Sequence, residues 1–389
     1  MRASPDPSEP FGPWTGQMSR KIVFVVNHAG FFLSHRLPLA RAAQLAGFEV
    51  IIATPRSRHS PQIESAGFLW EPVRLSRSGL DPWSEATTLA DLYRLYRRHR
   101  PDLVHHVTTK PVVYGTAIAR AVGVRAIVNA ISGMGYAFGQ PGLLRSTLAA
   151  GYRMSLRHPN MRVIFQNDSQ REFFVHRKWL KHDQTIVIRG SGVDTEVFAP
   201  PLVRPTGSPL VCLVSRMLTT KGIPEFVEAA RILRAENLDA RFALVGESDP
   251  DNPDSIAEEQ LRRWHAEGSI EYWGRRGDVA EILRGSAIAC LPTYCPEGVP
   301  KSLIEAAASG LPIVTTDIPG CRELVLDGET GIRIPIKQVG PLVVALRTLL
   351  RDPELRMRMG ARGRARVLAH YSLAYVVEAH LRVYADLLG

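Results

Sequence analysis

Two carboxylates, Glu297 and Glu305, frame a turn in the second half of the sequence, eight residues apart. An apolar run, expected to be a strand, ends at Pro292, and the pattern predicts a helix over residues 301–309. Glu297 then precedes the helix and Glu305 lies on its second turn. Isolated glutamates usually face solvent. At this strand–loop–helix turn, Glu297 and Glu305 can accept hydrogen bonds from sugar hydroxyls and from a ribose diol, as acidic residues do in dinucleotide sites.

The predicted helix start between these carboxylates offers backbone donors. Pro300 fits the first helical position, where its missing N–H costs nothing. The remaining N–H groups of this segment should point out of the helix start and bind an anion, aided by the helix dipole. The segment comprises Gly298, Val299, Pro300, Lys301, Ser302 and Leu303.

Two cations, Arg216 and Lys221, follow another predicted strand end, where ligands of α/β sheets bind. Arg through its planar fork and Lys as a point charge can together grip a diphosphate. A leaving nucleoside diphosphate needs such groups, because negative charge builds on it as the glycosidic bond breaks. The alternative is a pair of exposed surface cations.

Glycine and acidic residues follow a further strand end. The absent side chain of Gly246 would let a ligand approach the backbone. Asp249-Pro250-Asp251 has the form of a metal-binding D-x-D, but its acidic, turn-rich surroundings favour a solvated loop. Four cysteines (212, 290, 295 and 321) form no C-x-x-C pair, and two lie in apolar runs, which indicates buried thiols and no zinc. We expect no metal.

The net charge of +10 is unevenly distributed. Residues 1–200 carry 25 Lys and Arg against 14 Asp and Glu, whereas residues 201–389 carry 23 against 24. A basic half suits nucleic acid, an anionic membrane surface or a phosphate-bearing substrate, or is simply a solvated Arg-rich surface. No apolar run is long enough to span a membrane.

Short apolar runs alternate with helical patterns, which is typical of parallel βαβ units. The runs expected to be strands are 21–26, 49–54, 103–107, 126–131, 163–166 and 185–188, then 210–215, 241–246, 270–273, 288–292 and 312–316. The sequence therefore predicts two doubly wound α/β domains that face an interdomain cleft. Predicted boundaries are a disordered tail (1–18), a first domain (19–198), a Pro-rich linker (199–209), a second domain (210–365) and a C-terminal helix packing back on the first domain (366–389).

An ordered set of residues resembles the family-4 retaining glycosyltransferases of the GT-B fold. The set comprises Arg216, Lys221, Gly246, Gly274, Arg275, Glu297, Glu305, Gly310-Leu311-Pro312, Pro319-Gly320 and Glu323. The resemblance covers residues 20–385 and is most specific over 210–331. It implies that Glu297 holds donor-sugar hydroxyls, Glu305 holds the ribose, and Arg216 and Lys221 grip the diphosphate. It also implies retention of anomeric configuration without metal or cofactor, the nucleotide-sugar being a substrate.

In the first domain, the resemblance places a Gly-rich loop after the first strand, where Gly30 fits against the donor phosphates. Many relatives carry D-x-x-H-x-H in a later strand. Here Asp102 is followed by His105 and His106, and Val107 occupies the second His position. Adjacent residues lie on opposite faces of a strand. His105 keeps the first His position and is the predicted donor contact.

Residues 131–157 carry features that indicate the kind of acceptor substrate. Glycines at 133, 135, 139 and 142 predict a flexible loop, and residues 143–157 alternate Arg with Leu and Met as a basic amphipathic helix does. Such a helix lies on an anionic membrane or packs on the core with its cations solvated. The first half looks most similar to bacterial transferases that extend polyprenyl-diphosphate-linked sugars for capsule, O-antigen, exopolysaccharide or glycoprotein glycans. That likeness implies a UDP-hexose or UDP-N-acetylhexosamine donor and a cytoplasmic enzyme peripheral to the inner face of the membrane.

Two other functions remain open at this stage. A nucleotide-sugar epimerase shares the two-domain fold, but it needs acids placed for proton transfer at the sugar. A nucleic-acid-binding protein would use the basic half, but the sequence lacks interleaved aromatics and a recognisable module. We therefore expect no nucleic-acid partner.

Overall fold

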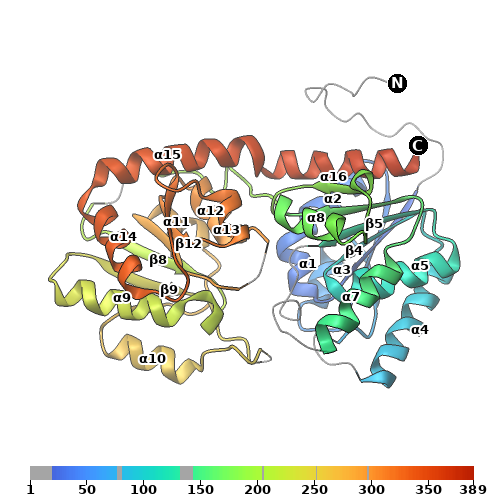
Figure 1. The fold of residues 1–389 in the computed structure, drawn as a ribbon, viewed down its shortest axis with the longest axis horizontal. Coiled ribbons are helices and arrows are strands. Elements are labelled where there is room, and N and C mark those ends of the chain that lie inside the picture. The colour runs from blue at the N-terminus through green and yellow to red at the C-terminus, as the bar shows by residue number, and fades with distance from the viewer. Residues whose placement is uncertain (1–19, 77–80, 132–142, 204–205, 251, 296–297) are drawn as a thin grey trace.

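A computed structural model describes residues 20–76, 81–131, 143–203, 206–250, 252–295 and 298–389, with residues 143–148 described by their backbone only. Within these residues the chain forms two parallel sheets, each flanked by helices (Figure 1). The predicted pair of doubly wound α/β domains is confirmed.

The sheet of the first domain has seven strands in the order β3-β2-β1-β4-β5-β6-β7. All neighbours are parallel, and β1 and β4 end level with each other, since Val26 pairs with Val107. The strands are β1 (Lys21–Val26), β2 (Glu49–Thr54), β3 (Leu69–Pro72), β4 (Leu103–Val107), β5 (Ala126–Ile131), β6 (Met161–Phe165) and β7 (Thr185–Val187).

Helices cover both faces of this sheet because its strands are apolar on both faces. Alternate β1 residues enter two cores: Phe24 packs with residues of α1, α2 and α3, and Val25 packs with residues of α4, α5 and α8. The described helical elements are α1 (Ala29–His35), α2 (Leu37–Leu45), α3 (Ser60–Ser65), α4 (Pro82–His99), a π-helical turn (Pro111–Gly115), α5 (Thr116–Val122), α7 (Leu143–Ser155), α8 (Asp168–His176) and a 3-10 turn (His182–Gln184).

The sheet of the second domain has six parallel strands in the order β10-β9-β8-β11-β12-β13. They are β8 (Leu210–Val214), β9 (Arg241–Val245), β10 (Glu271–Tyr272), β11 (Ile288–Leu291), β12 (Ile313–Thr316) and β13 (Gly331–Ile334). The described helices are a 3-10 turn (Thr219–Lys221), α9 (Ile223–Ala235), α10 (Glu258–Ala266), α11 (Val279–Arg284), α12 (Lys301–Ala308), α13 (Pro319–Leu324), α14 (Val339–Arg351) and α15 (Pro353–His370).

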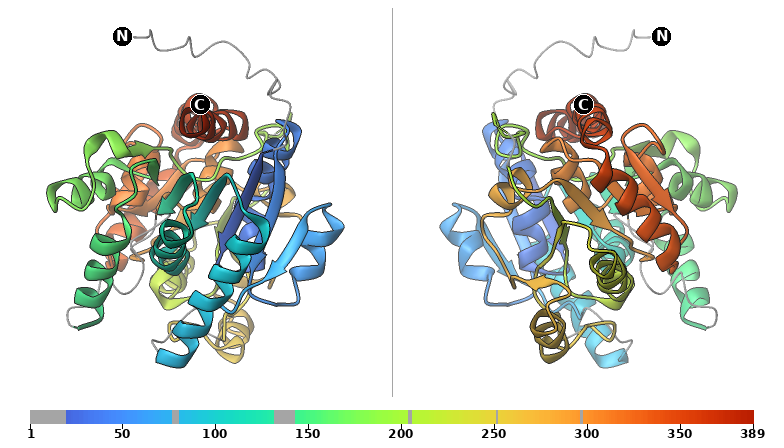
Figure 2. Two further views of the ribbon diagram at one scale, coloured as in Figure 1. Left: turned by 90° about the vertical axis from the view of Figure 1, so that its right-hand side faces the viewer. Right: turned by 90° about the vertical axis from the view of Figure 1, so that its left-hand side faces the viewer.

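The C-terminal helix α16 (Leu373–Leu388) follows α15 but lies along the outside of the first domain (Figures 1 and 2). Its residues Val376, Leu381, Tyr384 and Leu388 belong to the same core as β1 and α2. The chain thus crosses between the domains twice, once between β7 and β8 and once between α15 and α16.

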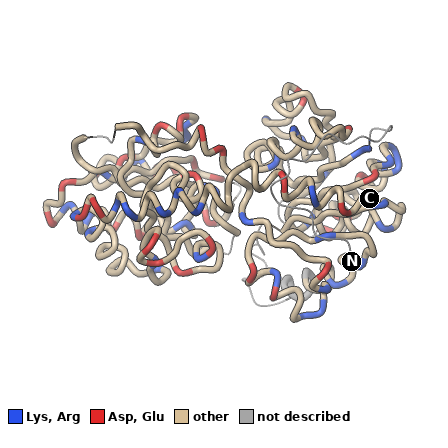
Figure 3. Tube along the Cα trace, turned by 90° about the horizontal axis from the view of Figure 1, so that it is seen from above, with Lys and Arg blue, Asp and Glu red and all other residues tan. Residues whose placement is uncertain are grey.

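The charge asymmetry of the sequence is visible in space. Figure 3 shows acidic and basic positions mixed over the second domain and mostly basic positions at the outer end of the first.

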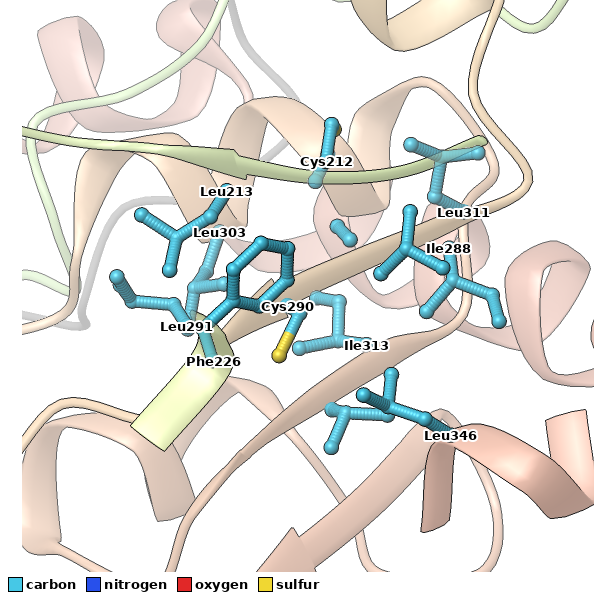
Figure 4. Packing of buried hydrophobic residues seen from close by; sticks show 14 of the residues in the cluster. Cys212, Leu213, Phe226, Ile288, Cys290, Leu291, Leu303, Leu311, Ile313 and Leu346 are labelled. Carbon is cyan, nitrogen blue, oxygen red and sulfur yellow. The ribbon is translucent and has the colours of Figure 1, made fainter. Parts of the chain in front are cut away.

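The core of the second domain contains the thiols expected to be buried. Cys212 and Cys290 lie in it, and burial raises the pKa of both, so they stay protonated and inert. Figure 4 shows them packed among side chains of β8, β11, β12, α9 and α12.

Two strands were not predicted. β3 and β13 have four residues each and lie at sheet edges, and β3 contains Trp70, Glu71 and Pro72, a composition with no apolar alternation. Short edge strands bury little of their surface and therefore leave a weak pattern.

Candidate functional site

The strand order of each sheet locates a binding edge. The order reverses between β1 and β4 in the first sheet and between β8 and β11 in the second. Ligands of open α/β sheets bind beyond the carboxyl ends of the strands at this reversal. The segment with Arg216 and Lys221 follows β8, and the predicted anion-binding segment follows β11. The fold thus brings the two predicted parts of the donor site to one place.

The carboxyl ends of the two sheets face each other across the domain boundary. Polar contacts between described residues join them: the Lys301 ammonium donates to the Ser34 carbonyl at 2.7 Å, Arg58 pairs with Glu247 at 3.4 Å, the Val299 N–H donates to Gln166 at 3.1 Å, and Arg189 pairs with Glu323 at 3.1 Å. In each case both partners lie beyond the carboxyl end of a strand of their own sheet. The candidate site therefore lies between the domains.

Lys221 is held by a tight turn. It ends the 3-10 turn after β8, and its residue is only 7% exposed. The next residue, Gly222, has φ 75°, and a β-carbon there would lie 2.1 Å from the Pro292 carbonyl oxygen. The Tyr294 N–H also donates to the Thr220 carbonyl at 2.9 Å. The turn that carries Lys221 is therefore pinned to the loop after β11.

Arg216 lies on the same segment and is paired with an acid. Its guanidinium donates to the Asp249 carboxylate at 2.6 Å, and the Asp249 side chain is only 14% exposed. The Asp249 N–H donates to the Ser255 hydroxyl, and Ser255 forms an isolated β-bridge with Leu218, two residues after Arg216. The sequence predicted a solvated loop at 249–251. Instead, Asp249 is a partly buried partner of Arg216, while Asp251 lies outside the described residues.

Arg275 and Gly246 lie next to this pair. Arg275 pairs with Glu247 at 3.3 Å, and Glu247 is also the partner of Arg58 from the first domain. Gly246 has φ 144°, and a β-carbon there would lie 1.8 Å from the Ser215 carbonyl oxygen. Its missing side chain therefore makes room for the protein's own backbone just after β8, and the predicted approach of a ligand to Gly246 stays a prediction.

The helix start after β11 differs slightly from the prediction. Helix α12 begins at Lys301, as the pattern predicted, but Pro300 is its N-cap and not its first helical residue. The N–H of Val299 is bound to Gln166 and that of Leu303 to the Pro300 carbonyl. In the part of the chain that the structure describes, the N–H groups of Lys301 and Ser302 have no recorded acceptor. Glu297, the first predicted carboxylate, lies outside the described residues.

Glu305 is largely buried, with a side chain 13% exposed. Burial raises the pKa of its carboxyl, and the Lys301 ammonium at 3.4 Å opposes that rise. A surface position, the alternative considered from the sequence, is thus excluded. A poorly hydrated carboxylate is a strong acceptor for hydroxyl groups.

His35, to which the sequence assigned no role, faces the cations of the second domain. Its ring stacks on Phe31 with centroids 4.1 Å apart, and Nδ1 contacts the Ser34 hydroxyl at 2.7 Å. Burial, together with the charges of Lys301, Arg36 and Arg216, lowers the pKa of His35 to about 3, so the imidazole is neutral. Its position after the first strand was the only sequence signal for it.

The paired histidines of β4 are both wholly buried, on opposite faces of the sheet as predicted. His105 contacts the Tyr384 hydroxyl at 2.5 Å and stacks on Phe24, whereas His106 contacts Tyr96 and Asn129, each at 2.8 Å. Burial lowers the pKa of both imidazoles. The His105 side chain has no contact with solvent and packs helix α16 onto the sheet. The structure therefore does not support the predicted contact of His105 with the donor.

The predicted Gly-rich loop after β1 is a helix. His28 caps α1 by accepting from the Phe31 N–H at 3.3 Å, so Gly30 lies in the first helical turn. A β-carbon at Gly30 would lie 3.0 Å from the His28 ring. Glycine here allows close packing of that ring.

Helix α7 packs on the core through one side and exposes its other side to solvent. Tyr152 is wholly buried against Phe174, whereas Met154 is 68% exposed between Arg153 and Arg157, which are also exposed. The predicted glycine loop and the Arg145 side chain lie outside the described residues. Among the described residues, no helix is long and apolar enough to cross a membrane, and no cluster of three or more His, Cys, Asp or Glu side chains could hold a metal.

Two family models together match most of this chain. Residues 208–352 match the family model described as "Glycosyl transferases group 1", and residues 21–167 match "Glycosyl transferase 4-like". Two curated relatives are similar along most of their length. One is the N,N'-diacetylbacillosaminyl-diphospho-undecaprenol alpha-1,3-N-acetylgalactosaminyltransferase of Campylobacter jejuni, 27% identical over 92% of this chain and 97% of the relative. The other is the UDP-Gal:alpha-D-GlcNAc-diphosphoundecaprenol alpha-1,3-galactosyltransferase of Escherichia coli, 24% identical over 77% of this chain and 79% of the relative.

Solved structures share the fold. A glycosyltransferase from Rickettsia africae superposes with a TM-score of 0.77 at 17% identity, covering 95% of this chain and 99% of the other. Anabaena HepE, crystallised with UDP, superposes with a TM-score of 0.76 at 16% identity, covering 94% of this chain and 100% of the other.

Proposed function

Because this chain belongs to the group 1 glycosyltransferases, we propose that it transfers a hexose or N-acetylhexosamine from a UDP-sugar, with retention, to a polyprenyl-diphosphate-linked glycan. Its two facing sheets form the GT-B fold, as predicted from the sequence. The observation that carries the proposal is the meeting of Arg216, Lys221 and the start of α12 at the strand reversal of the second sheet.

The donor site uses groups suited to a nucleoside diphosphate sugar. Arg216, Lys221 and the N–H groups of Lys301 and Ser302 bind the diphosphate, and Arg275 adds positive charge beside it. Glu305 accepts from the ribose diol and Glu297 from hydroxyls of the sugar. The acids Asp249 and Glu247 pair with Arg216 and Arg275. When the donor binds, its phosphates compete with these two carboxylates for the guanidinium N–H groups of Arg216 and Arg275.

Transfer requires a good leaving group. The bond between the anomeric carbon and the UDP oxygen breaks while the acceptor hydroxyl bonds to the same face of that carbon. The acceptor proton passes to the departing phosphate, so that the products are glycosylated acceptor and UDP. The cations stabilise the negative charge that develops on the phosphate, without a metal ion.

The acceptor is assigned from the first domain and from the relatives. Two relatives are named for transfer to diphospho-undecaprenol-linked sugars. The excess positive charge of residues 1–200 suits a diphosphate in an anionic bilayer. The glycan belongs to capsule, O-antigen, exopolysaccharide or glycoprotein synthesis, and the enzyme works at the cytoplasmic face of the membrane.

A panel of nucleotide-sugars tests the proposal. UDP-sugars should raise the melting temperature, and the one that stabilises most should be consumed with an undecaprenyl-diphosphate-linked sugar as acceptor. Interconversion of a UDP-sugar without acceptor would instead indicate an epimerase. A salt-dependent gel shift without nucleotide-sugar binding would indicate a nucleic-acid-binding protein.

The role of Glu305 predicts a pH dependence. The ribose diol donates to the ionised carboxylate, whose pKa is raised by burial, so the contact is lost as pH falls through that raised pKa. As the pH falls, UDP affinity should therefore weaken by about tenfold. This weakening should occur at a higher pH than it would for a Glu of ordinary pKa, about 4.3. Calorimetric titrations of the wild type and Glu305→Gln measure this. The difference between them cancels the titration of UDP itself, and parallel pH profiles would contradict the assignment.

The exposed cations at the end of α7 (Arg153) and two residues beyond it (Arg157) predict membrane binding. Each cation near an anionic bilayer contributes about 1 kcal/mol, so Arg153→Ser with Arg157→Ser should weaken binding on the order of thirtyfold. Sedimentation with vesicles containing phosphatidylglycerol measures it. The matched control, Arg358→Ser with Arg362→Ser, removes two exposed cations from α15 of the second domain. Equal losses in both double variants would reject α7 as the membrane contact.

A further inference from the structure

Gln166 joins the first domain to the donor segment of the second. It is the first residue after β6, is 7% exposed, and accepts a hydrogen bond from the Val299 N–H at 3.1 Å. Val299 itself is only 6% exposed and lies directly before Pro300, the N-cap of α12. A side chain of one domain thus binds the backbone that leads into the predicted phosphate-binding helix start of the other.

The contact matters because a buried N–H needs an acceptor. A buried donor left unsatisfied costs the full penalty of its desolvation, whereas a satisfied one fixes the backbone that bears it. In the described part of the chain, Gln166 is the recorded acceptor for the Val299 N–H. The conformation of residues 298–300 therefore depends on the first domain being in place.

Gln166 is held rigidly enough to set that conformation. The neighbouring residue Asn167 caps α8 by accepting from the Gln170 N–H at 2.8 Å, which fixes the backbone at this point. The Gln166 side chain lies beside Arg36, Ile164 and His380, around a small cavity at the carboxyl edge of the first sheet. The backbone that carries its amide is thus fixed within the first domain.

A second contact shows that α12 is seated directly on the first domain here. Gly190 has φ 70°, and a β-carbon at this position would lie 2.6 Å from Cδ1 of Ile304. Ile304 belongs to the first turn of α12 and is wholly buried. The start of the helix is therefore supported both by packing on Gly190 and by the hydrogen bond from Val299 to Gln166.

We infer that Gln166 is a positioning residue for sugar transfer, which aligns the N–H groups of Lys301 and Ser302 on the donor diphosphate by binding the Val299 N–H. The inference rests on the proposed function. It makes the alignment of the phosphate-binding helix start depend on the two domains being together. Gln166 acts through the backbone of residues 298–300 and touches neither donor nor acceptor.

Three variants test this inference. Gln166→Met keeps the length of the side chain but lacks an acceptor, and it should lower kcat/KM for the donor by about tenfold to a hundredfold, the effect of one unsatisfied buried donor. Gln166→Glu keeps an acceptor oxygen and should restore most of the activity. The matched control is Gln170→Met, which alters an equally buried glutamine on α8 that lies within the first domain.

The outcomes separate the inference from the function on which it rests. If the wild type neither binds UDP nor transfers sugar, the proposed function fails. If the wild type is active and Gln166→Met is equally active, or if Gln166→Glu is as impaired as Gln166→Met, the positioning role is wrong. Should Gln166→Met melt early, Gln166→Asn, whose amide is too short to reach Val299, replaces it with the same expected loss.

Discussion

Replacing Lys221 by alanine is expected to lower the rate of sugar transfer by about a hundredfold to a thousandfold, the typical effect of removing one group that stabilises transition-state charge. Lys221 is buried beside the loop after β11, and its turn is pinned to that loop by Gly222 and Tyr294. A cation in that place stabilises the charge that develops on the departing diphosphate. The effect should fall mainly on kcat, because that charge is largest in the transition state.

The control for Lys221→Ala is Lys337→Ala. Lys337 is exposed and its ammonium lies 4.7 Å from the ring centroid of Tyr294, so it is a cation near the same loop with no proposed role. Both variants should melt at temperatures close to that of the wild type. If Lys221→Ala and Lys337→Ala both transfer sugar at the wild-type rate, Lys221 is not part of the donor site.

Replacing Glu297 by alanine is expected to lower transfer by a similar factor, about a hundredfold or more, but through a different ligand group. Glu297 is proposed to accept from hydroxyls of the donor sugar, which UDP lacks. Calorimetry should therefore find wild-type affinity for UDP and a reduced affinity for the UDP-sugar. Glu305→Ala should weaken UDP and the UDP-sugar alike, because its partner is the ribose that both ligands carry.

This pairing of variants makes the assignment specific. Glu297→Ala that loses affinity for UDP and UDP-sugar equally would place Glu297 near the nucleotide instead of the sugar. Wild-type transfer by Glu297→Ala would remove it from the site altogether.

The sequence predicted the fold well wherever local pattern determines structure. The apolar runs that became β1, β2, β8 and β11 are buried on both faces, so their composition alone marks them as strands. The Gly and Pro residues around 298–300 likewise indicated the turn into α12. Edge strands β3 and β13 lack this pattern and were missed: β3 has no buried residue, and in β13 two partly buried residues lie between two buried ones.

The site was only partly predictable, since several of its contacts join residues far apart in the chain. The pairs Arg216–Asp249 and Gln166–Val299 depend on how loops and domains meet, and no local spacing records that. The packing role of Gly246 was missed for the same reason, because the backbone it approaches belongs to Ser215, directly after β8. His105 was selected by its position in a motif, whereas its environment is set by α16, nearly three hundred residues away.

A calorimetric titration of UDP, in the presence of EDTA, tests the central claim most directly. The claim is that a nucleoside diphosphate binds at the strand reversal of the second sheet, held by protein cations without a metal ion. The wild type should bind one UDP per chain, and the double variant Arg216→Ala, Lys221→Ala should show binding weakened by about a hundredfold or more. Absence of binding by the wild type, or equal affinity in both proteins, would contradict the account.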